Sequence, residues 1–199
     1  MEGIVVRAYP SGESDLVLRV ITDAQGKIAV FAPRARRSMR RFSAKIDVLD
    51  YGYLELKKGR GALPMLAAFN SLSAFPGLRG DLDRLSTASM ICEAFDLLLP
   101  EEGHEAQETF HVLLLSLRSI DKAEGLRSIL RTSFLTLATL LNITGFDTNQ
   151  AGGQPTRRNF LALLDQIESL AERRLATRSA LEAALQRLDL AEKSDLNRG

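Results

Sequence analysis

The chain has 199 residues, of which 45% are hydrophobic and 26% charged, with 14 Gly and 6 Pro. These proportions are typical of a globular protein with one ordinary domain or two small ones, and they exclude a disordered or collagen-like chain. The single cysteine, Cys92, excludes an internal disulfide and a zinc knuckle built from thiolates, and favours a reducing, cytoplasmic compartment. No stretch approaches the roughly 20 apolar residues that span a bilayer, so we expect neither secretion nor membrane insertion.

Charge is distributed unevenly along the chain. The formal net charge is only +1, but residues 1–75 carry twelve Lys and Arg against seven Asp and Glu. Residues 76–145 carry six against ten, and residues 146–199 carry eight of each sign. Basic character is therefore concentrated at the N-terminal end.

Residues 1–75 predict a small barrel. Short β-branched and aromatic runs alternate with turn residues and indicate five strands, at residues 4–9, 16–22, 27–32, 48–56 and 65–72. Several strands are apolar on both faces, as at Ile28, Val30 and Phe31, which favours a closed sheet partly covered by the rest of the chain.

After Pro76 the apolar residues recur at helical spacing. Five helices are expected, at residues 82–99, 105–118, 124–142, 158–174 and 178–190, with a loop at 147–156. Asp81 is the expected N-cap of the first helix, and Gly145 is expected to end the third. The buried stripe of the first helix is expected to consist of Leu82, Leu85, Ala88, Cys92, Phe95 and Leu99. That of the third is expected to consist of Leu126, Ile129, Leu130, Phe134, Leu137 and Leu141.

Three separate segments of the chain form a specific combination, namely GIVVRAYPSGESDLVLRVITDAQGKIAVFAPRARRSMRRF, LELKKGRGALPMLAAFN and FPGLRGDLDRL. In their order and spacing they resemble the bacterial recombination mediator family RecO. The resemblance implies an α+β fold, in which a five-stranded OB-fold barrel at residues 1–75 packs on an all-helical domain at residues 76–199. It also implies a cytoplasmic, nucleoid-associated protein that is not an enzyme. Such a protein would bind single- and double-stranded DNA, anneal complementary strands, and assist recombinase loading with RecR and single-strand-binding protein.

One segment departs from the family pattern. Many members follow the motif that LLNITGF resembles with a zinc-binding loop made of two Cys-x-x-Cys pairs. The corresponding segment here, DTNQAGGQPTRRNF, contains no cysteine. The resemblance therefore implies a zinc-free or divergent member, and the region after Thr156 looks shorter than is usual in the family.

The segment between the third and fourth expected strands is rich in arginine. Guanidinium groups bind phosphate oxygens in bidentate fashion, and several of them on one loop would follow a polyanion while releasing its condensed counterions. OB-folds bind single strands across a sheet face and its loops, which favours a nucleic-acid contact over a merely solvated loop. The residues expected to contact phosphate are Arg34, Arg36, Arg37, Arg40, Arg41 and Lys45.

Three further features are open to two interpretations each. A second basic cluster at a strand turn consists of Lys57, Lys58 and Arg60. These side chains either extend the phosphate track or are simply solvated. Phe42 either stacks on a base or anchors the arginine segment on the barrel. Tyr51 and Tyr53 share one face of their strand, where they either stack on bases or pack in the interior.

Enzymatic chemistry finds little support in the sequence. Gly26 and Lys27 resemble the end of a P-loop, but the glycine required five positions earlier is Ile21. Glu13 and Asp15 flank the start of a strand without the second carboxylate cluster that two-metal chemistry needs, so we expect turn roles for them.

The remaining metal and nucleophile candidates are few. His104, Glu108 and His111 share one side of the second expected helix. Such a group is more often an exposed polar stripe than a metal site. Cys92 lies in the apolar stripe of the first helix, where a cysteine behaves as a small hydrophobe. We expect no metal and no cofactor.

The partner-binding prediction rests mainly on the resemblance, which implies that the helical domain captures the acidic, hydrophobic-ended tail of single-strand-binding protein. Arg127 and Arg131 are four residues apart on the third helix and border its apolar stripe, so they could flank an apolar slot. They could equally be solvated or pair with Glu124. Two other functions stay open: a protein-interaction scaffold, and an RNA-binding OB-fold protein without annealing activity.

Overall fold

The computed structural model describes residues 1–36, 45–59, 61–72, 75–101, 105–146 and 155–196. The chain forms two compact units. The first comprises Met1–Ala74 and Leu99–Leu114, and the second comprises Phe75–Leu98 and Leu115–Gly199. No helix in the described ranges is long and apolar enough to cross a membrane.

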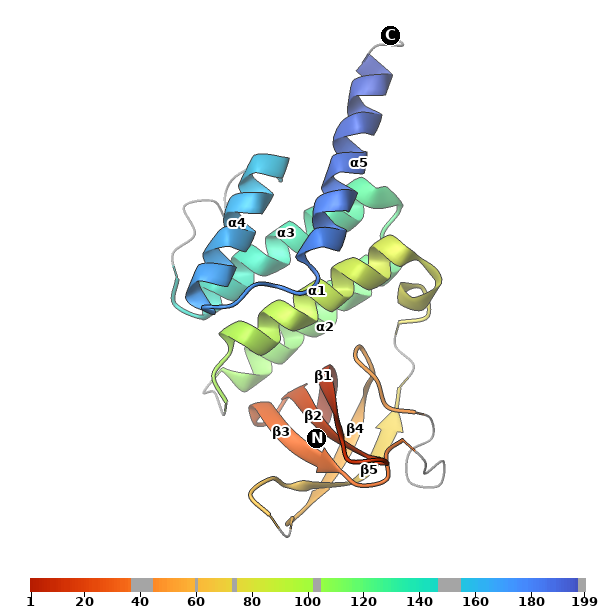
Figure 1. Ribbon diagram of the computed structural model, residues 1–199, viewed down its shortest axis with the longest axis vertical. Helices are drawn as coiled ribbons and strands as arrows, with labels where there is room; N and C mark the ends of the chain where they lie inside the picture. Colours follow the sequence, from red (N-terminus) through yellow and green to blue (C-terminus); the bar gives the residue numbers. More distant parts are fainter. Residues whose placement is uncertain (37–44, 60, 73–74, 102–104, 147–154, 197–199) are drawn as a thin grey trace. The chain divides into compact units, whose positions relative to one another are not determined.

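The first unit contains a five-stranded barrel (Figure 1). Its strands are β1 (Glu2–Ser11), β2 (Asp15–Thr22), β3 (Gly26–Ala32), β4 (Tyr51–Lys57) and β5 (Met65–Ser71). They follow one another around the barrel in the order β1-β2-β3-β5-β4, and β1 closes the barrel on β4. The pairs are antiparallel, except that β3 meets β5 in parallel at Phe31 and Met65. The expected OB-fold barrel is confirmed.

The fourth strand begins three residues later than the sequence predicts. Residues 47–50 form a turn, in which the backbone N–H of Asp47 donates to Asp50 Oδ2 at 2.7 Å. Leu49 in this turn has a φ of 73°, a left-handed backbone conformation that no strand contains. The extended backbone therefore begins only at Tyr51.

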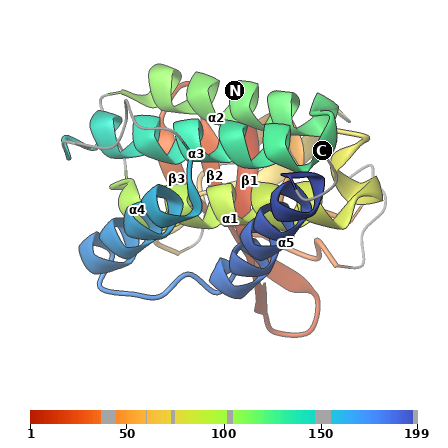
Figure 2. The same cartoon turned by 90° about the horizontal axis from the view of Figure 1, so that it is seen from above.

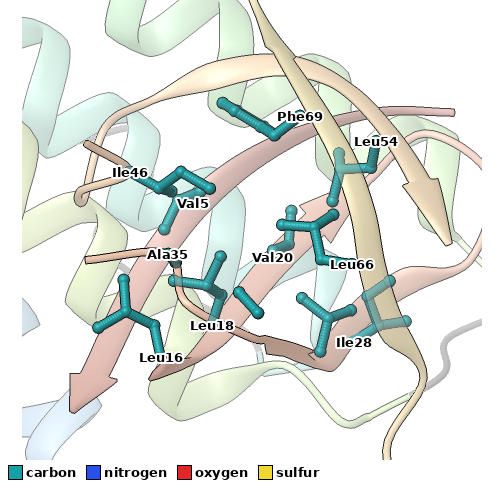
Figure 3. Packing of buried hydrophobic residues seen from close by; sticks show 12 residues of the cluster. Val5, Leu16, Leu18, Val20, Ile28, Ala35, Ile46, Leu54, Leu66 and Phe69 are labelled. Atoms are coloured by element: carbon teal, nitrogen blue, oxygen red, sulfur yellow. The ribbon is translucent and has the colours of Figure 1, made fainter. Parts of the chain in front are cut away.

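Alternating side chains fill the barrel (Figure 3). On β2, Leu16, Leu18 and Val20 point inward, as the period of two in a strand requires. Each buried aliphatic side chain of this size stabilises the fold by about 1.5–3 kcal/mol. Two members of the same cluster, Ala35 and Ile46, come from outside the strands and lie on either side of residues 36–45, which make up most of the arginine segment.

Residues 99–114 belong to the same unit as the barrel and contact it. Glu101 forms an isolated bridge with Lys27 and an ion pair with Arg19 at 3.7 Å. Helix α2 (Ala106–Lys122) begins in this unit. The ring of Phe110 in its second turn lies 6.3 Å from the ring of Tyr51, so part of the barrel is covered by helix, as the two-sided apolar strands predict.

The second unit is helical. It contains the short helix η1 (Leu78–Gly80), α1 (Leu82–Leu98), the end of α2, α3 (Gly125–Ile143), α4 (Arg157–Leu170) and α5 (Arg178–Leu196). Helix α1 contacts α3, α4 and α5. Figure 2 shows α2 running alongside α3, and Thr136 Oγ1 on α3 donates to Ser116 Oγ on α2 at 2.7 Å.

Helix α1 begins where the sequence predicts, because the Asp81 carboxylate accepts the Arg84 N–H at 2.9 Å. Its expected buried stripe is wrong at one end. Leu82 is 77% exposed, since the first turn meets α5 through the ion pair of Asp83 with Arg187 rather than through apolar contact. The central turns are buried on nearly every side, and even Glu93 in them is buried.

Helix α3 ends as predicted. Gly145 has a φ of 81°, and its N–H donates to the carbonyl of Asn142 at 3.0 Å. The N–H of Phe146 reaches back to the carbonyl of Leu141 at 2.9 Å, so the last turn is closed by a glycine in the left-handed region.

The two C-terminal helices have other bounds than predicted. Helix α4 ends at Leu170 rather than at residue 174, because carboxylates hold the chain that follows it. Glu168 accepts the Leu175 N–H at 2.9 Å, and Glu93 accepts the N–H groups of Ala176 and Thr177 at 2.9 and 3.1 Å. Helix α5 continues to Leu196 rather than ending at residue 190, since residues 191–196 contain no glycine or proline to stop it.

The loop expected at 147–156 lies largely outside the described residues. Its last residue, Thr156, caps α4 by accepting the Asn159 N–H on its hydroxyl at 3.3 Å.

Candidate nucleic-acid interface

The arginine segment is hydrogen-bonded, where it leaves the barrel, to residues 13–15 at the turn between β1 and β2. The backbone N–H of Arg34 donates to Asp15 Oδ1 at 2.7 Å. The backbone N–H of Arg36 donates to the Ser14 carbonyl at 3.0 Å, and its guanidinium donates to the Glu13 carbonyl at 3.3 Å. Three consecutive turn residues thus hold the start of the segment, while the side chains of Arg34 and Arg36 are exposed as expected.

Arg34 has an unusual backbone. Its φ of 57° places a non-glycine residue in the left-handed region, which costs on the order of 1 kcal/mol or more. Asp15 offsets this cost by accepting the Arg34 N–H, and Ser14 Oγ donates to the same carboxylate at 3.0 Å. The Arg34 N–H, and then the Ser14 hydroxyl, lower the pKa of Asp15. The anchor is therefore a charged carboxylate at neutral pH.

The segment returns to the barrel through a second buried residue. Ala35 and Ile46 are 3% and 2% exposed, and both pack in the barrel core (Figure 3). Lys45, directly before Ile46, is exposed. The remaining predicted residues, Arg37, Arg40, Arg41 and Phe42, lie outside the described residues, so their phosphate contacts and both interpretations of Phe42 stay predictions.

The second basic cluster lies at the end of β4. Lys57 and Lys58 are exposed, and Arg60 lies outside the described residues. Because β4 pairs with β5 through Lys57 and Met65, and β5 pairs with β3 through Met65 and Phe31, this cluster lies beside the end of β3. The arginine segment begins from the same end of β3. A common polyanion therefore has cations available from both segments.

The two tyrosines have different surroundings. Tyr51 is buried, contacts Phe110 and donates its hydroxyl to Glu2, so it packs in the interior. Tyr53 is 46% exposed and is the cross-strand neighbour of Glu2, whose carboxylate raises the pKa of the Tyr53 hydroxyl. A carboxylate at this position repels phosphate, which makes Tyr53 a poor site for stacking on nucleic acid.

The structure also describes several of the enzymatic and metal candidates, whereas His104 lies outside the described residues. Asp15 accepts hydrogen bonds from Arg34 and Ser14 and has no second carboxylate cluster beside it in the described part of the chain. Cys92 is fully buried, and burial raises the pKa of its thiol, which leaves it protonated and unreactive at neutral pH. Among the described residues, no group of three His, Cys, Asp or Glu side chains could hold a metal ion.

Arg127 and Arg131 are exposed on α3, but the apolar residues they border are not. Ile129, Leu130 and Phe134 are at most 3% exposed and cannot line an open slot. Two other apolar side chains are exposed on α2 and α3, each one residue before a member of the hydrogen-bonded pair Ser116 and Thr136. They are Leu115, 59% exposed, and Leu135, 46% exposed.

Sequence reasoning missed the role of the Glu13-Ser14-Asp15 turn as the anchor of the arginine segment. The residues gave a partial signal, since a turn carboxylate is a common acceptor for a neighbouring backbone. The partner, Arg34, is 19 positions away, and only the pairing of β2 with β3 brings the two together.

Comparison with known proteins agrees with the fold. Residues 1–75 match the family model described as Recombination protein O N terminal, and residues 79–151 match Recombination protein O C terminal. The chain is 31% identical over 146 residues to the DNA repair protein RecO of Pelobacter propionicus, covering 73% of this chain and 58% of that protein. It is 30% identical over 134 residues to the protein of the same name from Desulfatibacillum aliphaticivorans, covering 66% and 52%.

A third relative, the DNA repair protein RecO of Anaeromyxobacter dehalogenans, is 33% identical over 133 residues, covering 66% of this chain and 52% of that protein. The chain thus spans about half the length of the curated relatives it matches. The two family models together cover most of the sequence. The first covers the strands of the barrel, and the second covers residues of the helical unit. The chain belongs to the RecO family of DNA repair and recombination proteins.

Proposed function

We propose that this chain is a non-enzymatic recombination mediator in DNA repair, which binds single- and double-stranded DNA and anneals complementary strands. The observation that carries the proposal is the anchoring of the arginine segment by Asp15 on an OB-fold barrel. Family membership supports the role in repair, and the basic excess of residues 1–75 supports a polyanionic ligand.

The physical basis of annealing is charge neutralisation. Two complementary strands repel each other through their phosphates, and a protein that holds cations against both lowers this repulsion. Arg34 and Arg36 follow β3 on one anchored backbone, and Lys57 and Lys58 lie at the end of β4, which is separated from β3 by β5. Cations on two separate segments suit contact with two strands better than a single row would.

An annealing assay tests the proposal. Two complementary oligonucleotides, one with a fluorophore and one with a quencher, are mixed with and without the protein at low and moderate salt. We expect faster quenching with the protein, and an acceleration that falls as salt rises. Unchanged annealing, together with no salt-dependent binding to either strand alone, would contradict the proposal. Competition by a matched RNA strand separates DNA binding from the RNA-binding alternative.

We further propose that the helical unit recruits partners, namely RecR and the C-terminal tail of single-strand-binding protein. For the tail, the supporting observation is that Leu135 is exposed on α3 four residues after the exposed cation Arg131, with Arg127 one turn earlier. An acidic peptide that ends in hydrophobic residues needs apolar surface with cations beside it, and this surface offers both. The same exposed surface is what a protein-interaction scaffold would present.

A further inference from the structure

A cavity of about 660 Å³ opens on the barrel at the connection between β4 and β5. Its volume lies within the roughly 300–1,000 Å³ of small-ligand pockets. The lining residues are Phe31, Lys58, Gly59, Gly61, Ala62, Leu63 and Met65. Most of this lining is apolar, with one ring and one cation.

The cavity is held open by backbone contacts. The Phe31 N–H donates to the carbonyl of Pro64 at 2.9 Å, which ties the connection to β3. At Gly59, a Cβ would lie 2.1 Å from the carbonyl oxygen of Leu63, so the connection folds back on itself at a distance that only glycine permits. At Gly61, a Cβ would meet nothing within 4 Å, so the chain there borders open space.

The chemistry of the lining selects among ligands. Phe31 supplies an aromatic face, and Met65 and Leu63 supply apolar walls, which suit a flat, weakly polar ring. Lys58 at the edge supplies a positive charge, which suits a ring that carries an anionic group. An unpaired nucleobase with its attached phosphate combines these two properties.

The location strengthens this choice. Phe31 is three residues before Arg34, and the backbone between them leads directly from β3 into the arginine segment. A DNA strand whose phosphates contact Arg34 and Arg36 therefore passes close to the cavity. Lys57, exposed beside Lys58, adds to the positive charge on that side.

We propose that this cavity receives one unpaired base of single-stranded DNA, stacked on Phe31, with Lys58 on the adjoining phosphate. The inference rests on the proposed DNA binding and names the part of the strand that this site takes. It makes the protein distinguish unpaired from paired DNA, since a base inside a duplex cannot enter the cavity without leaving its stack.

The test compares two oligonucleotides of equal length and charge. One is an oligothymidylate, and the other is the same sugar–phosphate chain without bases. Because base–aromatic stacking strengthens binding by about five- to 150-fold per base, the full-length chain should bind the oligothymidylate more tightly by a factor in this range. Phe31→Leu should remove most of this preference while leaving the affinity for the baseless strand and its salt dependence unchanged.

Three further variants make the result specific. Phe31→Trp keeps an aromatic face and should retain the preference. Gly61→Val narrows the cavity at a position with free space, and should lower the preference even if Phe31→Leu proves too unstable to measure. Tyr53→Leu removes an exposed ring beside Glu2, outside the cavity, and should change nothing.

A fluorescent base analogue gives a second readout. A 2-aminopurine within an oligothymidylate should be quenched on binding to the wild-type chain and not on binding to Phe31→Leu. If the wild-type chain binds both strands equally in a salt-dependent manner, the cavity proposal is overturned and DNA binding stands. A preference that survives both Phe31→Leu and Gly61→Val also overturns it, and binding to neither strand overturns the proposed function as well.

Discussion

The carboxylate of Asp15 and the backbone N–H of Arg34 lie 2.7 Å apart, although 19 positions separate the two residues in the sequence. Asp15 begins β2, and Arg34 follows β3. The bond lies next to the paired start of β2 and end of β3, where Leu16 faces Ala32. It therefore fixes the position of the first residues of the arginine segment relative to the sheet. It also stabilises the strained backbone of Arg34 through a hydrogen bond whose acceptor is the charged carboxylate of Asp15.

We predict that Asp15→Asn weakens DNA binding without unfolding the barrel. The neutral amide accepts the Arg34 N–H less strongly, so the start of the arginine segment is less well aligned. Binding to a fluorescent single strand measures the loss, and circular dichroism checks the fold. Glu13→Gln is the matched control, because it keeps the backbone carbonyl to which Arg36 donates, and affinity should stay the same.

The same anchor predicts a pH dependence. The folded pKa of Asp15 is lowered, so its stabilising contribution is present above the ordinary Asp pKa of about 3.9 and is lost as the pH falls through the lower folded value. The thermal unfolding midpoint of the wild type should exceed that of Asp15→Asn at neutral pH, and the two should converge in acid. A difference that persists unchanged at pH 2 would contradict this assignment.

The arginine segment should set the salt dependence of binding. Four or five phosphate contacts give a slope of log K against log salt on the order of −3 to −3.5, at about −0.7 per contact for single strands. Replacing Arg36, Arg37, Arg40 and Arg41 together by Ala should flatten this slope while the protein stays folded, because surface substitutions change stability by only about 0.5 kcal/mol each.

A charge-matched control belongs to this experiment. Arg157, Arg158, Arg173 and Arg174 are exposed in the helical unit. Their joint replacement by Ala removes the same number of charges and should leave the slope near the wild-type value. If both sets flatten the slope equally, net charge rather than the arginine segment governs binding. If neither does, the assignment of the segment is wrong.

Partner recruitment can be measured with a labelled acidic tail peptide. We expect micromolar binding to the wild type that is lost in the Arg127→Ala, Arg131→Ala double variant and weakened by Leu135→Ser, since the peptide needs both the cations and the exposed apolar surface. Arg173→Ala is the control for charge. Equal binding by all variants would place the site elsewhere, and no binding to any would remove tail capture from the proposal.

Glu93 should be among the most sensitive positions for stability. Its carboxylate is buried and accepts hydrogen bonds from the N–H groups of Ala176 and Thr177 and from the Thr177 hydroxyl at 2.8–3.1 Å. Glu93→Ala leaves these donors without their acceptor and should lower the free energy of unfolding by about 2–4 kcal/mol in urea titrations. Glu182→Ala, which removes a partly exposed partner of Arg178, should lower it by less than about 1 kcal/mol.

Metal analysis tests the absence of the family's cysteine pairs. We expect negligible stoichiometric zinc in the purified protein and no change in thermal unfolding on chelation, because Cys92 is buried and no metal-holding group occurs in the described part of the chain. One zinc per chain, removed by a chelator with loss of folding, would show that residues outside the described ranges form a site.

The barrel was predictable because inward and outward side chains alternate along its strands, and this pattern is visible in each short stretch of sequence. The inward positions of β2, Leu16, Leu18 and Val20, and the glycine that ends α3 are readable one segment at a time. The end of α4 was not, because a carboxylate from α1, Glu93, captures the chain after it across 83 positions. Leu82 was assigned to the interior because period alone does not say which turns of a helix meet a neighbour.

The candidate site divides in the same way. The cations were predictable from composition, since exposed Lys57 and Lys58 need no tertiary information to be recognised. The importance of Asp15 and the cavity beside Phe31 depend on which strands become neighbours. Phe31 looked like one more residue of a two-sided apolar strand, and only the parallel pairing with Met65 gives it a position at the cavity.

Because Ala35 and Ile46 are both buried in the barrel core, the stability of the barrel depends little on the length of the chain between them. Both side chains belong to the core, so the barrel is packed on either side of residues 36–45. Doubling the length of a loop costs only about 0.6 kcal/mol in closure entropy. Residues can therefore be inserted or removed between these two positions, changing how far the cations reach, while the barrel itself keeps its stability.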